Sequence, residues 1–175
     1  LVNTLLEVAK IEAGEYSFSM SKFEISKIII AIAANFEMQL NEKKIDLKIV
    51  LPPKKTYTMA DQDSIYRVIY NLMENAVKFT EENGKVIITS SNNGNFIEIS
   101  VIDNGIGIST DNLAKLFRID TQYTSKGTKN EEGTGLGLLL CKEMIEINKG
   151  TIRVQSEIGK GTSFIFTLPH GSLTD

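Results

Sequence analysis

One long amphipathic helix constrains the fold more than any other part of the sequence. From Asp61 to Phe79 the apolar residues recur three and four positions apart, so they form one stripe along a helix. The stripe consists of Ile65, Val68, Ile69, Leu72, Met73 and Ala76. A helix of this length with one apolar side has to pack against another layer of secondary structure.

Shorter periodic segments surround this helix. Apolar spacing predicts helices at 25–40, 111–117 and 138–148, and residues 1–13 have the pattern of a helix end that Gly14 caps. Alternating apolar residues predict strands at 17–23, 46–51, 85–91, 96–102, 151–156 and 162–168. Helices mixed with hairpins in this order predict an α+β domain whose helices pack on one face of a sheet.

Composition and charge exclude several classes of function. The chain has 19 basic and 22 acidic residues and a formal net charge of -3, which argues against a nucleic-acid partner. No apolar run approaches the ~20 residues that cross a bilayer, so no direct membrane contact is expected. The single cysteine, Cys141, lies in an apolar helical run and is interpreted as core rather than as a nucleophile. The chain begins within a helical pattern and without methionine, so we expect it to belong to a longer protein.

The long helix carries a polar face opposite its apolar stripe. At about 100° per residue, Asn71, Asn75 and Lys78 lie within roughly 60° of one another. One interpretation is an ordinary solvated face. The other is a ligand site, because an amide oxygen can bind a hard cation such as Mg²⁺ while a lysine meets phosphate charge.

Two glycine-rich segments follow. Asp103, Gly105 and Gly107 come directly after a predicted strand, where they form either an ordinary turn or a loop that approaches a ligand closely. The segment 133–138 opens a predicted helix, and free N–H groups at a helix start bind anions. The spacing of a P-loop is absent from it, and so is a dinucleotide-binding arrangement, because the segment follows a loop rather than a strand. Between these segments the sequence loses its periodicity, which is typical of a functional lid, here at about 106–134.

The three motifs together resemble the N, G1 and G2 boxes of the histidine-kinase ATPase domain, a family related to gyrase B, heat-shock chaperones and mismatch-repair ATPases. The resemblance covers roughly 23–169. Residues 116–118 look like the F box, 159–164 like the closing hairpin, and 5–14 like the tail of the second helix of the dimerisation domain. It implies a two-layer α/β sandwich of Bergerat type, with a mixed, mainly antiparallel sheet of about five strands, about three helices on one face and a long ATP lid.

The resemblance also implies roles for individual residues. Asp103 binds the adenine amine, Gly105 and Gly107 give room for the ring, Thr162 supports the adenine end, and Tyr123 packs on the ribose or adenine. At the phosphate end, Asn75 ligates Mg²⁺ with Asn71 beside it, Lys78 contacts phosphate, and Arg118 reaches the γ-phosphate. Backbone groups at the helix start hold phosphate oxygens; these residues are Gly133, Thr134, Gly135, Leu136, Gly137 and Leu138.

The function that the resemblance implies is transfer of the γ-phosphoryl group of Mg-ATP to a histidine. His170, the only histidine, lies in a polar tail and is interpreted as incidental, so the acceptor is expected on a dimerisation domain upstream. We expect the end of that domain at 1–14, the catalytic domain at 15–170 and a tail at 171–175. The further expected partner is the receiver domain of a response regulator, and the expected location is cytoplasmic, with a membrane-anchored parent protein.

Two other functions stay open at this point. A conformational ATPase of the gyrase or chaperone type would hydrolyse ATP, but such relatives carry a glutamate where this sequence has Asn71, and an amide is a poor general base. A nucleotide-binding scaffold without catalysis would show a damaged motif, and none is damaged.

Overall fold

A computed structural model of the chain describes residues 6, 9–11, 13–118, 126–129, 131 and 135–171. At its centre is a five-stranded sheet with the strand order β2-β4-β5-β7-β6. β2 runs parallel to β4, and the other neighbouring pairs are antiparallel. The strands are β2 (Asp46–Val50), β4 (Lys85–Asn93), β5 (Phe96–Asp103), β6 (Ile152–Glu157) and β7 (Gly161–Pro169).

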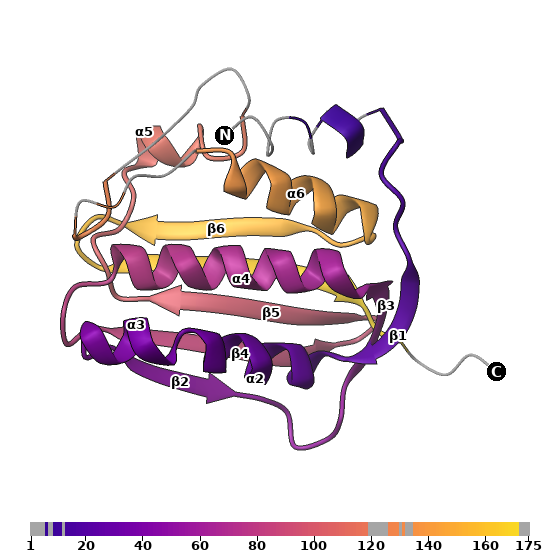
Figure 1. Cartoon of the computed structure of the whole chain (residues 1–175), viewed down its shortest axis with the longest axis horizontal. Helices are drawn as coiled ribbons and strands as arrows, with labels where there is room; N and C mark the ends of the chain where they lie inside the picture. Colours follow the sequence, from indigo (N-terminus) through magenta and orange to yellow (C-terminus); the bar gives the residue numbers. More distant parts are fainter. Residues whose placement is uncertain are drawn as a thin grey trace.

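Helices cover one face of this sheet. Figure 1 shows α4 between α2 and α6, and it contacts both. The described helices are α2 (Ile25–Asn35), α3 (Glu37–Glu42), α4 (Gln62–Phe79), α5 (Thr110–Leu113) and α6 (Gly137–Ile147). The predicted α+β class, with a mixed sheet of five strands and its main helices on one face, is confirmed.

α4 is the predicted amphipathic helix and holds the centre of the core. Its whole apolar stripe is buried. Asp61 caps its start by accepting a hydrogen bond from the backbone N–H of Ser64 at 2.7 Å. Thr80 takes an extended conformation and ends the helix. α4 therefore has a fixed place on the sheet, and with it the polar face that the sequence analysis singled out.

The secondary structure differs from the predictions in detail, and the helix predicted at 111–117 is limited to α5 (Thr110–Leu113). The helix expected at 25–40 is broken at Phe36, whose backbone leaves the helical region while its ring packs on Tyr70 with centroids 4.9 Å apart. A strand that was not predicted, β3 (Tyr57–Asp61), pairs antiparallel with β1 (Met20–Glu24) in a separate two-stranded sheet. β3 lacks an apolar alternation because its inward positions are Thr58 and Ala60, which are small and fully buried.

Two smaller predictions about single residues are confirmed. Gly14 has a left-handed φ of 69°, and hydrogen bonds from Gly14 N to Ile11 O and from Glu15 N to Lys10 O close the helix end before it. Cys141 is buried in α6, and burial raises the pKa of its thiol to about 12 although Arg67 lowers it in part. A thiol in that state is not a nucleophile.

Candidate functional site

A cleft of about 410 Å³ opens between α4, the start of α6 and the loop that follows β5. Its walls come from segments that are far apart in the sequence. Most of the residues that the sequence analysis singled out line it, namely Asn71, Asn75, Lys78, Asp103, Gly107, Gly135, Gly137, Leu138 and Thr162.

The remaining candidates are not in this lining. Gly105 and Leu136 are buried directly beside it. Arg118 is exposed after α5, outside the set of described residues that form the cleft. Tyr123, Gly133 and Thr134 lie outside the described residues, as does much of the segment expected to form a lid.

Asp103 forms the floor of the cleft at the end of β5. Its side chain is buried, and Oδ1 accepts hydrogen bonds from the backbone N–H of Gly105 at 2.9 Å and of Thr162 at 3.2 Å. Burial raises the pKa of the Asp103 carboxyl to about 6, and the two N–H donors offset part of that rise. The carboxylate is therefore ionised at neutral pH, but close to its titration range.

Hydroxyl groups extend this floor. The hydroxyls of Ser156 and Thr162 lie 2.9 Å apart on paired strands, and Ser156 Oγ accepts a hydrogen bond from the backbone N–H of Ile108 at 2.8 Å. These contacts fix the loop after β5 on the β6–β7 hairpin. Gly107 is required in that loop, because it has a φ of 72° and a Cβ would overlap with the carbonyl of Glu157.

The polar face of α4 forms the opposite wall. Asn75 donates a hydrogen bond from Nδ2 to Oδ1 of Asn71 at 3.2 Å. A Cβ on Gly137, the first residue of α6, would lie only 2.5 Å from Asn71 Nδ2. The start of α6 thus packs closely on the asparagine face of α4. Because its Nδ2 is used in this bond, Asn75 keeps its oxygen for a ligand.

The sequence analysis missed other residues of the cleft. Phe36 and Gln39 come from the broken helix, where no motif marks them, and Phe164 comes from β7. Their role depends on tertiary packing, which the sequence did not reveal. Glu74 and Glu131 also line the cleft, and their signal was available, since Glu74 precedes Asn75 directly and Glu131 lies within the expected lid.

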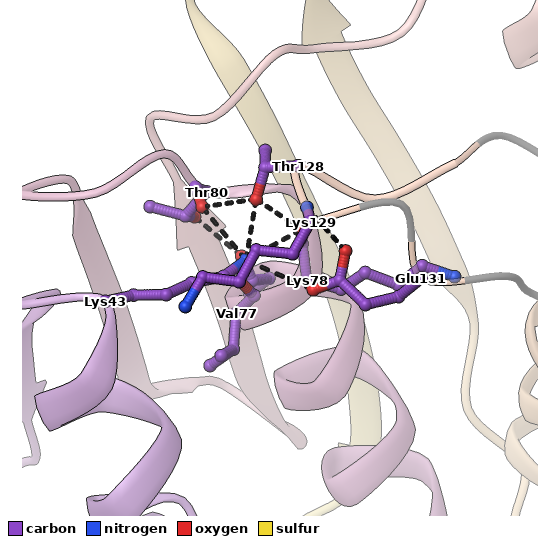
Figure 2. Close-up of polar contacts among 8 residues, drawn as sticks. Lys43, Val77, Lys78, Thr80, Thr128, Lys129 and Glu131 are labelled. Atoms are coloured by element: carbon purple, nitrogen blue, oxygen red, sulfur yellow. Dashed lines mark hydrogen bonds and ion pairs between the residues drawn. The ribbon is translucent and has the colours of Figure 1, made fainter.

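The C-terminal end of α4 carries a polar network that the sequence analysis did not anticipate. Buried Lys43 lies against the last carbonyl groups of α4 and contacts Thr128 and Glu131 (Figure 2). Lys78, also in α4, borders both this network and the cleft, and its Nζ lies 5.1 Å from the centre of the Phe79 ring.

Within the described residues, no group of three or more histidine, cysteine or acidic side chains is placed to hold a metal ion. A divalent cation in the cleft could take oxygen ligands from a bound molecule. The Asn75 amide is compatible with that arrangement, because Mg²⁺ accepts one or two protein oxygens alongside phosphate oxygens and water.

Residues 60–172 match the family of histidine kinase-, DNA gyrase B-, and HSP90-like ATPases. The matched span contains the cleft residues from α4, β5, α6 and β7. The chain belongs to this ATPase family. The resemblance inferred from the three motifs is thereby confirmed.

Curated relatives within the family are sensor histidine kinases. A sensor-like histidine kinase of Rhizobium meliloti is 36% identical over 169 residues, which cover 97% of this chain and 32% of that protein. The sensor histidine kinase WalK of Bacillus subtilis is 36% identical over 172 residues, which cover 97% of this chain and 28% of that protein. The chain thus spans about a third of the length of these relatives.

Solved structures of histidine kinases share the fold of this chain. The catalytic domain of histidine kinase ThkA, in a nucleotide-free form, superposes with a TM-score of 0.76 at 29% identity and covers 87% of this chain and 96% of that one. Full-length ShkA in complex with AMPPNP superposes with a TM-score of 0.82 at 27% identity, covering 99% of this chain and 36% of that one.

Among the described helices, none combines the length and apolar character needed to span a bilayer.

Proposed function

We propose that this chain binds Mg-ATP in the cleft and is the catalytic domain of a sensor histidine kinase. The observation that carries the proposal is that Asp103, from one motif, and Asn75 and Lys78, from another, line one cleft in a fold shared with histidine kinases. Structurally related ShkA was solved with AMPPNP, which supports a triphosphate as the ligand here.

The adenine end of the ligand belongs at the sheet. Asp103 Oδ1 is already hydrogen-bonded to two backbone N–H groups, so we assign Oδ2 to the exocyclic amine of adenine. Thr162 supports this end from β7, the strand that pairs with β5. Gly105 and Gly107 allow the backbone to pass close to the ring. Tyr123 is assigned to the ribose or adenine from the sequence motif alone.

The phosphates belong between α4 and the start of α6. Asn75 would hold Mg²⁺ through its amide oxygen, with Asn71 orienting it, and the metal would neutralise phosphate charge. Lys78 adds a positive charge, and the backbone of 133–138 is assigned to phosphate oxygens from the sequence motif. Arg118 is assigned to the γ-phosphate from the sequence motif.

The proposed reaction is transfer of the γ-phosphoryl group to an imidazole nitrogen. The bond between the γ-phosphorus and the bridging oxygen breaks, ADP leaves, and a P–N bond forms. His170 is not the acceptor, because it follows β7 at the end opposite to Thr162, about 25 Å away along the strand. Asn71 cannot activate water as a carboxylate does, which favours transfer over hydrolysis.

The acceptor is then supplied by another domain. We propose that 1–14 ends a dimerisation helix that carries this histidine upstream, that 15–170 is the catalytic unit and that 171–175 is a tail. The phosphoryl group would pass on to the receiver domain of a response regulator, and the domain would work in the cytoplasm.

The test is a calorimetric titration of Mg-ATP into the wild type, Asp103→Ala and Asn75→Ala, with phosphate release followed in parallel. We expect binding by the wild type, strong loss in both variants and negligible turnover. Absence of binding by the folded wild type would overturn the nucleotide site, and brisk hydrolysis would overturn the kinase assignment in favour of a conformational ATPase.

A further inference from the structure

Lys43 is a buried cation that no motif marked. It stands at the end of α3, where left-handed Lys44, with a φ of 52°, turns the chain and Ile45 N bonds back to Leu40 O at 2.8 Å. The carbonyl of Lys43 accepts a hydrogen bond from Asn83 N at 2.9 Å. Its side chain is only 6% exposed. A buried ammonium group needs partners for all of its donors, so its surroundings indicate its role.

The first set of partners is the end of α4. Lys43 Nζ donates to the carbonyls of Val77 at 2.9 Å, Lys78 at 3.1 Å and, more weakly, Thr80 at 3.4 Å. The last carbonyls of a helix lack partners within it and carry the negative end of the helix dipole. Lys43 thus caps α4 at the residue that the proposed function assigns to phosphate.

The second set of partners comes from the turn at 126–129 and from Glu131 (Figure 2). Lys43 Nζ lies 2.7 Å from Thr128 Oγ1 and 3.4 Å from Glu131 Oε1. Thr128 N in turn donates to Lys78 O at 3.1 Å. One ammonium group therefore joins α3, the end of α4 and a segment within the expected lid.

Two contacts connect this network to the cleft, one through Gly127 and Lys78 and one through Glu131. A Cβ on Gly127 would lie 2.6 Å from Cγ of Lys78, so the turn packs directly on the stem of that side chain. Glu131 lines the cleft, and its side chain is 38% exposed. A carboxylate there would repel phosphate oxygens, and the nearby Lys43 charge offsets that repulsion.

We propose that Lys43 is a positioning residue for the phosphate end of the nucleotide. It holds the turn at 126–129 against Lys78 and neutralises Glu131, without touching the ligand itself. The inference rests on the proposed nucleotide site. It is distinct from helix capping alone, which would support the stability of the fold and leave ligand affinity unchanged.

The test compares ATP and adenosine affinities, at a temperature where every variant is folded, in Lys43→Met, Thr128→Val and Glu131→Gln. The matched control is Lys44→Met, which removes the same charge from an exposed neighbour. We expect Lys43→Met to weaken ATP binding by about tenfold and adenosine binding by less than about twofold. Thr128→Val removes the hydroxyl that contacts Lys43 and the carbonyls of Lys78 and Thr80, but leaves the Lys43 charge, and is expected to show a smaller effect of the same kind.

The most specific part of this experiment is a double variant that tests whether removing the Glu131 charge compensates for the loss of Lys43. Glu131→Gln in the Lys43→Met background is expected to restore part of the lost ATP affinity, because it removes the unpaired carboxylate. If Lys43→Met and Thr128→Val bind ATP as Lys44→Met does, the positioning role is overturned and only the helix cap remains. If the wild type itself binds neither ligand, the proposed function fails instead.

Discussion

Asp103 and Thr162 face each other across β5 and β7, and the backbone N–H of Thr162 donates to Asp103 Oδ1 over 3.2 Å. This contact places a buried carboxylate where two paired strands meet the cleft. It also keeps the carboxylate ionised at neutral pH, because the N–H donors of Gly105 and Thr162 work against the effect of burial.

Adenosine binding is expected to weaken in mild acid. The pKa of Asp103 is raised from 3.8 to about 6, so lowering the pH from 7.5 to 5 protonates the proposed acceptor for the adenine amine. About tenfold weaker binding is expected at pH 5, one unit below that pKa. Adenosine is the probe because it carries no phosphate that titrates in this range. Asp103→Asn should show a weak affinity that does not change with pH, and a wild-type affinity that is flat from pH 7.5 to 5 would contradict the assignment.

Asp103→Asn is expected to stabilise the nucleotide-free chain at pH 7.5. A carboxyl whose pKa is raised by folding holds its proton better in the folded state, so its ionisation destabilises the fold as pH rises from about 4 through about 6. Asparagine keeps an oxygen for Gly105 and Thr162 without the buried charge. The shift implies a gain of up to about 3 kcal/mol in the free energy of unfolding. Urea denaturation at pH 7.5 and at pH 4 measures it, and the gain should shrink at the lower pH.

The sequence predicted the parts of this molecule that local patterns encode. The α4 stripe, the Gly14 cap and the hairpin strands follow from spacing and turn chemistry, and the structure confirms them. The break at Phe36 and strand β3 were missed because tertiary contacts decide them: Phe36 packs on Tyr70, and β3 buries a threonine and an alanine.

The cleft, too, could be predicted from the sequence only where local patterns encode it. Motif residues such as Asn75 and Asp103 were found because their types and spacing carry chemistry, and the structure places them in one cleft. Lys43 was not found, because a lysine before another lysine has the pattern of an exposed helix end. Its burial depends on contacts with Val77 at the end of α4 and with Thr128, which are 34 and 85 residues away in the sequence.

Asn75→Ala is expected to weaken ATP binding only while Mg²⁺ is present. The amide oxygen of Asn75 is the proposed protein ligand of the metal, so its loss should cost about tenfold or more in affinity for Mg-ATP. With EDTA in place of Mg²⁺, the wild type and the variant should bind ATP within about twofold of each other. Calorimetry under both conditions measures this, and adenosine serves as a ligand that needs no metal. An equal loss of ATP affinity with and without Mg²⁺ would show that Asn75 acts by packing on Asn71.

Gly107→Ala is expected to destabilise the chain more than Gly94→Ala. Both glycines have a left-handed φ, 72° for Gly107 and 63° for Gly94, so both variants bear a similar backbone cost of about 1–2 kcal/mol. A Cβ at Gly94 meets open space, whereas one at Gly107 overlaps with the carbonyl of Glu157. The added steric cost is about 1–3 kcal/mol, and displacement of the loop should also reduce adenosine affinity. Thermal melts and adenosine titrations measure the two effects; equal melting temperatures for both variants would mean that the loop after β5 does not need its close packing on the β6–β7 hairpin.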